Sequence, residues 1–577
     1  MNSKELSYVH VPHKRPMTHY ALHQLLDSMA EQRRDTEALV IYNMKLERAA
    51  MTYGQLKDWS RYLAASLLDL GLSRGQHVLL IGASSIRFAV SFMALQRFGA
   101  NTILLGPGGL SQDKVGQIKD LRVQAVVFDP DMRETQRLQL AKGIKQLLSD
   151  ISKETDPILV SLGDVTSCKC VTDLDSHMYD DLIVRGQESG LLHKLTLAEA
   201  EVQIDDPIVI VYTSGSTGSP KLVQHTCFSR TCSVLTWKDI SQDIRAEREI
   251  KYFDRPMAWG WGMLTLCCVV NDSTIVWVPT EITLNEEMNE VAFEIMQNEK
   301  CTNGIFSAAL MHKLTKDKLH LKYDLSSFEE FHYGGQVYPK TMISSVLEGL
   351  PFARGFHVFG STEGMLQAVK IIIKDGMNDD DFGELSVVPG CEVKTVGDGD
   401  EVVPRGTPGE ICVRSAMVFS EYVGNPEATK QAKTATGWFR LGDIGVMDES
   451  GKVKVLGRKK DFIKRATLKI SPLQIEKVIL GHADVSDAVV FGVPDQQLHE
   501  EICACVILKA ANNDRGLEVR LAELEAWCSE QFPPEADGLS LKPRYMLLVK
   551  TFPSGNTGKV DRRAMRDLAM QKLGISE

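Results

Sequence analysis

The sequence lacks the patterns that mark several common classes of protein. Its 12 cysteines include no paired C-x-x-C framework, which argues against a structural zinc site and favours reduced, intracellular thiols. No apolar run reaches the ~18 residues that a membrane helix needs, and residues 1–20 contain no apolar signal core. The sequence therefore predicts a cytoplasmic protein with no membrane span.

An excess of positive charge is also missing. The chain carries 65 Lys and Arg against 76 Asp and Glu, a formal net charge of −11, which argues against nonspecific binding of nucleic acid. With 44% hydrophobic and 24% charged residues the composition is that of an ordinary globular protein. Chemistry on a small molecule fits this balance better. At 577 residues the chain is too long for one core and is expected to form two or more domains.

Alternating helical and apolar β segments predict an α/β fold. Helical periodicity covers residues 53–70 and 86–97, and short apolar runs at 77–81 and 102–105 follow the pattern of strands. Further strands are expected at 123–128, 157–161, 209–212, 274–278 and 304–307. The first ~400 residues therefore predict layered αβα architecture with largely parallel sheets.

The character of the sequence changes after residue 380. Short alternating strands broken by Pro-Gly and Asp-Gly turns predict a β-rich subdomain over 381–457 of an N-terminal domain 1–457. A smaller α+β pattern follows in 458–577, so a domain boundary is expected near Lys460. Its expected elements are a strand at 461–463, a helix at 473–480, strands at 488–492 and 502–507, and a helix at 517–531.

A glycine- and hydroxyl-rich loop follows the apolar strand 209–212. Glycines permit close backbone approach, hydroxyls donate hydrogen bonds and the closing lysine adds charge, so the loop can wrap phosphate oxygens. The spacing differs from G-x-x-x-x-G-K-[S/T], which argues against an ordinary P-loop, and a flexible surface turn is the alternative. The candidate phosphate-binding residues are Thr213, Ser214, Gly215, Ser216, Thr217, Gly218 and Lys221.

The stretch from Tyr212 to Lys221 resembles the phosphate loop of the AMP-forming adenylating enzymes, the superfamily of acyl-CoA synthetases, peptide-synthetase adenylation domains and luciferases. Phe359-Gly360-Ser361-Thr362-Glu363 is similar to the Y-G-x-T-E motif of this family. The resemblance implies that the ring of Phe359 packs on adenine, Thr362 contacts the α-phosphate and Glu363 holds Mg²⁺, a hard cation suited to carboxylate oxygen.

Other motifs of the same family follow in its order. Gly334-Gly335-Gln336 resembles the strand end that borders adenine and the acid, with Gln336 replacing a commoner small residue. Asp443, in Gly437–Asp443, corresponds to the aspartate that accepts both ribose hydroxyls. Arg458 would be a second ribose or phosphate contact, and Lys460 falls at the family's hinge position.

The C-terminal loop around Lys559 resembles the family loop whose lysine enters the active site during adenylation. A cation there would stabilise the charge that develops as the carboxylate attacks, so Lys559 is the expected catalytic residue together with Thr362 and Glu363. A basic flexible tail is the alternative, because Arg562 and Arg563 extend the charged run.

The acid substrate is less well defined. Trp259 resembles the gate of the family's acyl pocket, and Trp259 and Trp261 are the candidates for its wall, with core tryptophans as the alternative. Asp254 invites comparison with the aspartate that binds an amino-acid ammonium group, but its spacing to Trp259 is one residue too long.

The resemblance implies a two-step ligase. A small carboxylic acid would react with ATP and Mg²⁺ to give acyl-AMP and pyrophosphate, and the thiol of coenzyme A would then displace AMP after the mobile C-terminal domain turns about Lys460. One alternative is a stand-alone amino-acid or aryl-acid adenylating enzyme that serves a separate carrier protein. Another is an inactive nucleotide-binding protein of the same fold.

Overall fold

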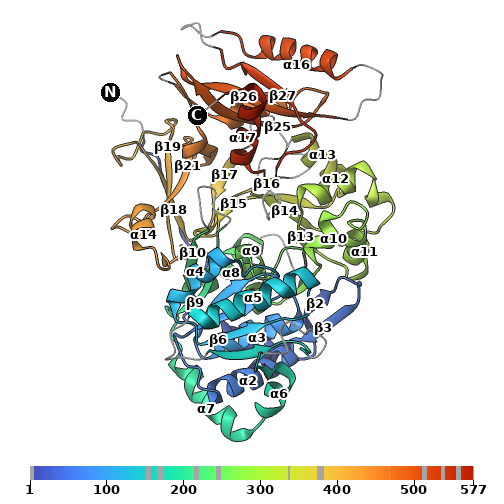
Figure 1. Ribbon diagram of the computed structural model, residues 1–577, viewed down its shortest axis with the longest axis vertical. Coiled ribbons are helices and arrows are strands. Elements are labelled where there is room, and N and C mark those ends of the chain that lie inside the picture. Colours follow the sequence, from blue (N-terminus) through green and yellow to red (C-terminus); the bar gives the residue numbers. More distant parts are fainter. Residues whose placement is uncertain are drawn as a thin grey trace.

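The protein folds into two large sheets with a smaller C-terminal part above them in the computed structural model (Figure 1). The structure describes residues 5–150, 157–165, 174–213, 220–241, 248–335, 338, 340–372, 383–466, 468–509, 516–534, 540–553 and 560–575. Helices and strands alternate through the first half of the chain, and strands dominate after residue 354. The expected fold class, a large layered α/β part with a β-rich region and a small α+β C-terminal part, is confirmed.

The first sheet has the strand order β20-β10-β9-β5-β4-β6-β7-β8. Its strands from β9 to β8 pair in parallel, whereas β10 pairs antiparallel with β9 and with β20. The bounds are β4 His77–Ile81, β5 Asn101–Leu105, β6 Ala125–Phe128, β7 Ile158–Ser161, β8 His177–Met178, β9 Pro207–Tyr212, β10 Leu222–Thr226 and β20 Glu421–Tyr422.

Strand alternation divides this sheet between two cores. In β4, Val78 and Leu80 join a central core with α2 (Tyr53–Asp69) and α3 (Ile86–Arg97), because successive strand side chains point to opposite faces. Leu79 and Ile81 point the other way. They pack with helices α4 (Gln112–Ile118) and α5 (Glu134–Asp150).

The second sheet has the order β1-β18-β19-β21-β22-β17-β16-β15-β14-β13-β11-β12-β2-β3. Strands β2, β12, β11, β13, β14 and β15 run parallel, and the strands on the β1 side of β15 pair antiparallel. The bounds are β1 Tyr8–Val11, β2 Glu37–Tyr42, β3 Arg48–Thr52, β11 Glu249–Phe253, β12 Ser273–Trp277, β13 Asn303–Ile305, β14 Glu330–Gly334, β15 Arg354–Ser361, β16 Met365–Ile372, β17 Glu384–Val387, β18 Cys391–Val396, β19 Gly409–Ser415, β21 Phe439–Met447 and β22 Val453–Arg458.

Helices fill the layer between the two sheets. The central core packs α8 (Cys227–Ser241) and α9 (Gly260–Cys267) with side chains from strands of both sheets. A separate core covers the opposite face of the second sheet with α11 (Val291–Asn298), α12 (Ala308–Lys316) and α13 (Lys340–Gly349). The helices between the sheets therefore approach the strand ends that carry the predicted motifs.

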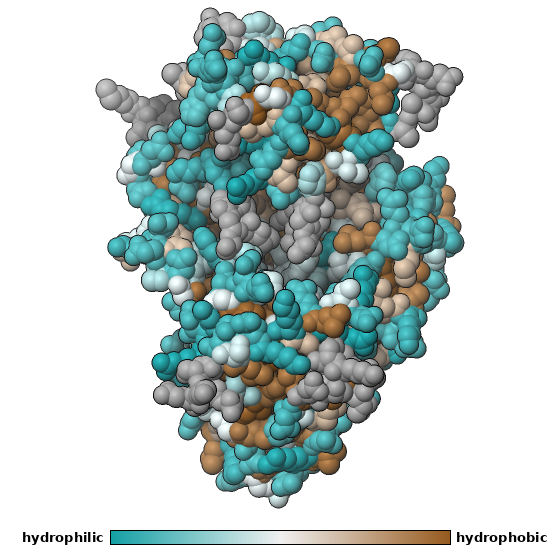
Figure 2. Space-filling model, in the orientation of Figure 1, coloured by the Kyte–Doolittle hydropathy of each residue, from teal (hydrophilic) through white to brown (hydrophobic). Residues whose placement is uncertain are grey.

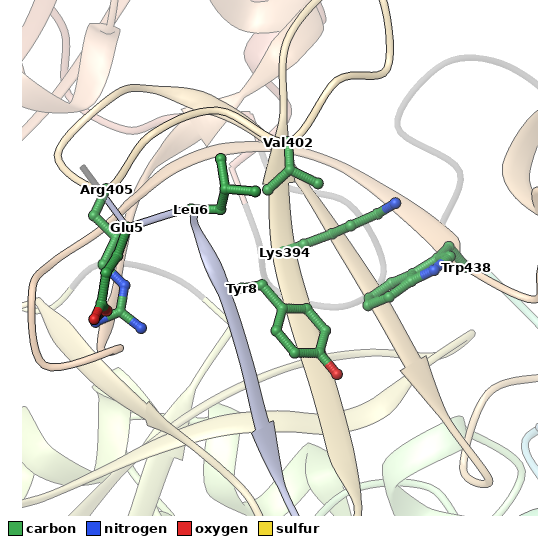
Figure 3. A pocket seen from close by; sticks show the side chains of 7 residues that line it. All are labelled: Glu5, Leu6, Tyr8, Lys394, Val402, Arg405 and Trp438. Carbon is green, nitrogen blue, oxygen red and sulfur yellow. Dashed lines mark ion pairs between the residues drawn. The ribbon is translucent and has the colours of Figure 1, made fainter. Parts of the chain in front are cut away.

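Two surface features follow from this arrangement. Figure 2 shows a hollow in the surface between the C-terminal part and the large sheets below it. The N-terminal strand β1 pairs with β18, nearly 400 residues away, and places Tyr8 beside Lys394 and Trp438 (Figure 3). The ring of Tyr8 lies edge-on to Trp438 at 6.3 Å.

The C-terminal part has a sheet and cores of its own. Strands β24, β23, β26 and β25 pair in that order, and β27 pairs with β26. Its elements are β23 Ile463–Arg465, β24 Leu468–Ile470, α15 Pro472–Ile479, β25 Val485–Asp495, β26 His499–Leu508, α16 Leu517–Gln531, β27 Tyr545–Leu548 and α17 Arg562–Leu573. The strand predicted near 461–463 begins two residues later, at Ile463 of β23, because Lys459–Asp461 form a 3-10 helix.

None of the helices in the described ranges is long and apolar enough to cross a membrane. The ten cysteines within the same ranges are free and buried.

Candidate active site

The base of the predicted phosphate loop is a closed hairpin. Tyr212, the last residue of β9, pairs with Leu222, the first residue of β10. The backbone N–H of Thr213 donates to the carbonyl of Lys221 at 3.0 Å, and the N–H of Lys221 donates to Oγ1 of Thr213 at 3.1 Å. Ser214, Gly215, Ser216, Thr217 and Gly218 lie outside the described residues, so their contact with phosphate stays a prediction.

Tyr422 connects Lys221 to Glu363. The ammonium group of Lys221 lies 4.5 Å from the ring centroid of Tyr422, and the Tyr422 hydroxyl donates to Oε1 of Glu363 at 2.9 Å. Burial and the neighbouring Glu363 carboxylate raise the pKa of Tyr422, so the hydroxyl keeps its proton at neutral pH. The sequence reasoning did not find Tyr422, because it reaches the site only through the pairing of β20 with β10.

The turn that carries Thr362 and Glu363 joins the antiparallel strands β15 and β16. Ring nitrogen Nε2 of His225, from β10, lies 2.8 Å from the carbonyl oxygen of Thr362. Burial lowers the pKa of His225 well below its usual value, so the neutral ring donates this bond. The N–H of Phe419 donates to the carbonyl of Glu363 at 2.7 Å. Residues from distant segments thus fix both motif residues.

The N-terminus of α9 packs against the same turn. A Cβ atom added to Gly260 would lie 3.3 Å from Cγ2 of Thr362, so this helix end lies in close contact with the motif. Trp259 is the N-cap residue of α9, and Trp261 lies edge-on to Trp237 of α8 at 6.1 Å. Trp261 also packs against the central core, so its assignment to the wall of an acyl pocket stays a prediction.

Glycine is required where β14 and β15 approach this turn. A Cβ atom on Gly334 would lie 2.2 Å from the carbonyl oxygen of Val358, and Gly335 has φ +79°. A Cβ atom on Gly360 would lie 2.2 Å from the carbonyl oxygen of Met365. Phe359 is half-buried beside it, and Gln336 lies outside the described residues.

Asp443 and Arg458 face each other on paired strands. They are register partners in β21 and β22, and Nε of Arg458 lies 3.2 Å from Oδ1 of Asp443. Their strands connect to the rest of the site through Phe439, whose ring lies 5.3 Å from Phe419. Phe419 in turn lies 4.7 Å from the ring of Tyr422.

The last two predicted functional residues belong to the C-terminal part. Lys460 lies in the 3-10 helix Lys459–Asp461. Lys559 lies outside the described residues, so its entry into the site stays a prediction.

Glu363 is the carboxylate that would serve a divalent cation. No cluster of three or more His, Cys, Asp or Glu side chains able to hold a metal occurs within the described part of the chain. Mg²⁺ suits such a site, because it commonly takes one or two carboxylates together with substrate phosphates. A single carboxylate such as Glu363 fits Mg²⁺ brought with a nucleotide, and its role as the protein ligand stays a prediction.

Residues 26–423 match the family model of AMP-binding enzymes, and residues 474–559 match that of their C-terminal domain. Because the first match covers more than half of the chain, the chain belongs to the AMP-binding enzyme family. A Bos taurus protein named medium-chain acyl-CoA ligase ACSF2, mitochondrial, is 25% identical over 95% of this chain and 88% of its own length.

Solved structures of the same fold are also similar. Anthranilate CoA ligase AuaEII, in complex with anthranoyl-AMP, superposes with a TM-score of 0.78 at 20% identity, covering 97% of this chain and 99% of its own. Amide bond synthetase McbA from Marinactinospora thermotolerans superposes with a TM-score of 0.77 at 22% identity, covering 95% of this chain and 99% of its own. At these identities the likeness shows the fold alone.

Proposed function

We propose that this chain is an AMP-forming carboxylate-CoA ligase. The observation that carries the proposal is the contact of Lys221, Tyr422 and Glu363 beside the Thr362 turn, because it joins a cation, a carboxylate and a nucleotide motif of the family. In the first step a carboxylate oxygen of the acid attacks the α-phosphorus of ATP, and pyrophosphate leaves. In the second step the thiol of coenzyme A attacks the acyl carbonyl and AMP leaves.

Each predicted residue has a role in this scheme. Lys221 and residues 213–218 hold phosphate oxygens, Thr362 contacts the α-phosphate, and Asp443 with Arg458 binds the ribose. Phe359, Gly334, Gly335 and Gln336 border adenine. When bound, Mg²⁺ supplies charge neutralisation at the phosphates. Lys559 stabilises the charge that develops during adenylation, because positioning and electrostatics account for most of the catalysis of such transfers.

The proposed domain division explains how one site serves two steps. Residues 1–457 form the adenylate-forming domain and residues 458–577 the mobile domain, which turns about Lys460 between the half-reactions. Coenzyme A is proposed as the acceptor because the relatives are named acyl-CoA ligases. A separate carrier protein is the competing acceptor. A cytoplasmic location stays a prediction.

Pyrophosphate exchange with a panel of fatty, aryl and amino acids tests the proposal. At least one class should support acid-dependent exchange, and coenzyme A should then convert the product to a thioester. Acyl-AMP that forms but reacts only with a carrier protein would replace coenzyme A as acceptor. No exchange with any acid would favour the inactive nucleotide-binding protein.

Lys559→Ala should lower adenylate formation by about two to three orders of magnitude, the scale of one lost charge-stabilising group. Transfer from supplied acyl-AMP to coenzyme A should stay near the wild-type rate, because the two steps use different faces of the mobile domain. An equal loss in both assays would contradict the role of Lys559.

A further inference from the structure

Arg230 of α8 is fully buried, and no carboxylate of the described residues pairs with it. Its Nη1 atom lies 2.6 Å from Sδ of Met365, a weak acceptor, and its Nε and Nη2 atoms have no hydrogen-bond partner in the described ranges. Burial lowers the pKa of Arg230 to about 10, which still leaves the guanidinium charged at neutral pH. The structure therefore encloses an uncompensated positive charge.

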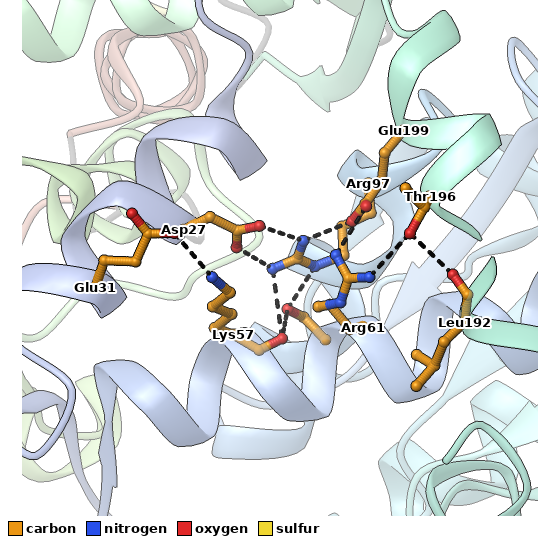
Figure 4. Close-up of polar contacts among 9 residues, drawn as sticks. Asp27, Glu31, Lys57, Arg61, Arg97, Leu192, Thr196 and Glu199 are labelled. Atoms are coloured by element: carbon orange, nitrogen blue, oxygen red, sulfur yellow. Dashed lines mark hydrogen bonds and ion pairs between the residues drawn. The ribbon is translucent and has the colours of Figure 1, made fainter. Parts of the chain in front are cut away.

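The other buried arginines of the described ranges have carboxylate partners. Arg97 is equally buried, and its guanidinium lies 2.7 Å from Oδ1 of Asp27 and 2.7 Å from Oε1 of Glu199 (Figure 4). Arg520 lies 3.2 Å from Oδ2 of Asp484. Because removing a charge from water is costly unless it is paired, an arginine that only supported the fold would be expected to have such a partner. Among the described residues no carboxylate fills this role for Arg230, so a carboxylate of a bound ligand can fill it.

The position of Arg230 indicates which partner this is. Met365 directly follows the Thr362–Gly364 turn, so the guanidinium contacts the first residue after this turn. Helix α9 packs in the same central core as α8, and its N-terminal end contacts Thr362 at Gly260. Arg230 therefore lies within the wall that α8, α9 and the motif turn build together.

Further along α8, Trp237 continues this wall. It lies seven residues after Arg230, and hence on the same helix face, and packs edge-on against Trp261. Trp261 is one of the two tryptophans assigned to the acyl pocket. The guanidinium thus shares a helix face with a residue that contacts this predicted pocket.

We propose that Arg230 is a specificity residue that binds a second carboxylate of the acid substrate, so that dicarboxylic acids are the preferred substrates. A guanidinium matches the two oxygens of a carboxylate with two parallel hydrogen bonds. The reacting carboxylate does not meet this need, because it loses its charge when acyl-AMP forms. A second carboxylate stays charged through both half-reactions. The inference rests on the proposed function and adds the substrate class.

The test compares matched acids in pyrophosphate exchange. Glutarate, adipate and suberate are measured beside pentanoate, hexanoate and octanoate, with wild type, Arg230→Met and Arg230→Lys. The wild type should favour each dicarboxylic acid by at least about tenfold in kcat/KM, the scale of a charged hydrogen bond. Arg230→Met should reverse this preference, and Arg230→Lys should retain part of it. The control Arg520→Met should leave the ratio of kcat/KM between dicarboxylic and monocarboxylic acids unchanged.

Thermal unfolding separates binding from catalysis. A dicarboxylic acid should raise the Tm of the wild type and not that of Arg230→Met. If every acid fails in pyrophosphate exchange while this Tm shift is seen, only the proposed function is overturned. Arg230→Met should itself unfold at a higher temperature than the wild type, because it removes an unpaired buried charge. A wild type that favours monocarboxylic acids, an equal loss of all acids in Arg230→Met, or no Tm shift with dicarboxylic acids would overturn the inference.

Discussion

Glu363 depends on a neighbour 59 residues away in the sequence. The Tyr422 hydroxyl holds one of its carboxylate oxygens and leaves the other able to accept a cation. Lys221 contacts the ring of the same tyrosine, so Tyr422 sets the distance between the two opposite charges. Tyr422 therefore acts through Glu363 as a positioning residue.

Tyr422→Phe should raise the Mg²⁺ concentration needed for half-maximal adenylation by about tenfold, because a hydrogen bond to a charged group contributes roughly 1.5–3 kcal/mol. Pyrophosphate exchange at varied Mg²⁺ measures this. The matched control is Tyr323→Phe, which removes a similar 3.0 Å bond to Glu290 elsewhere in the protein. An equal effect of the two variants would show that Tyr422 does not position Glu363.

The sequence could single out the motif residues, whose roles stay predictions, and it could not single out the residues behind them. Thr362, Glu363, Asp443 and Lys221 belong to short patterns in which glycines and polar residues have fixed spacing. His225, Tyr422 and Arg230 belong to no such pattern, because strand pairing and helix packing bring them to the turn. Their roles depend on contacts across 59 to 137 residues.

At the scale of elements, predictions succeeded where one periodicity continued over a whole segment. The bounds of α3 and β4 agree with the sequence pattern, since both combine clear periodicity with turn residues at each end. Strand β25 extends from Val485 to Asp495, beyond the predicted 488–492, because pairing with β26 continues past the apolar residues. Strand β1 was missed, since its partner β18 lies nearly 400 residues away.

Two contacts hold the base of the loop that carries Lys559. The N–H of Asp561 donates to the carbonyl of Pro553 at 2.8 Å, which closes the loop. Nη1 of Arg562 lies 2.7 Å from Oε1 of Glu476 and anchors the following helix α17 to α15. The Arg562–Glu476 ion pair therefore holds the base of this loop in a fixed place in the C-terminal part.

Glu476→Gln should therefore lower adenylation by about tenfold, less than Lys559→Ala, while leaving thioester formation from supplied acyl-AMP unchanged. Loss of one partner of this largely buried pair should also cost roughly 3–5 kcal/mol of unfolding free energy. Asp484→Asn is the control, because it weakens the Arg520 pair in the same part of the protein without touching the loop. Adenylation that falls equally in both variants would mean that only stability is affected.

At the scale of the whole molecule, the C-terminal part packs around cores of its own, as the proposed turn about Lys460 requires. It has two hydrophobic cores, one formed by residues from Ile463 onward and the other by residues from Val489 onward. Neither core shares a residue with the three large cores of the preceding chain. An ion pair that links it to the β-rich region joins two exposed side chains, Lys469 and Asp398, at 3.3 Å, and such a pair stabilises by at most ~1 kcal/mol. The Ser471 hydroxyl before α15 also donates to the carbonyl of Leu456 in β22, and Lys459 pairs with Glu410 at 2.9 Å, so polar contacts act beside the covalent connection through Lys459–Asp461.

Lys460→Pro tests whether the two half-reactions require a turn at this residue. Proline fixes φ near about −65°, a value within the 3-10 range, and it resists other values of this torsion. One half-reaction should stay within about twofold of wild type, and the other should fall by at least ~10-fold, because only one orientation remains accessible. Single-turnover assays of acyl-AMP formation and of thioester formation from supplied acyl-AMP measure the two separately.

The control places proline one residue earlier. Lys459→Pro is expected to be tolerated, because Lys459 is the first residue of the 3-10 helix and Arg458 before it has the extended backbone that proline favours. It leaves φ of Lys460 free, so both half-reactions should proceed. If Lys460→Pro also supports both at wild-type rates, the chain turns at another residue or uses one orientation for both steps. If the two variants lose the same half-reaction, the effect comes from proline in the linker and not from the torsion of Lys460.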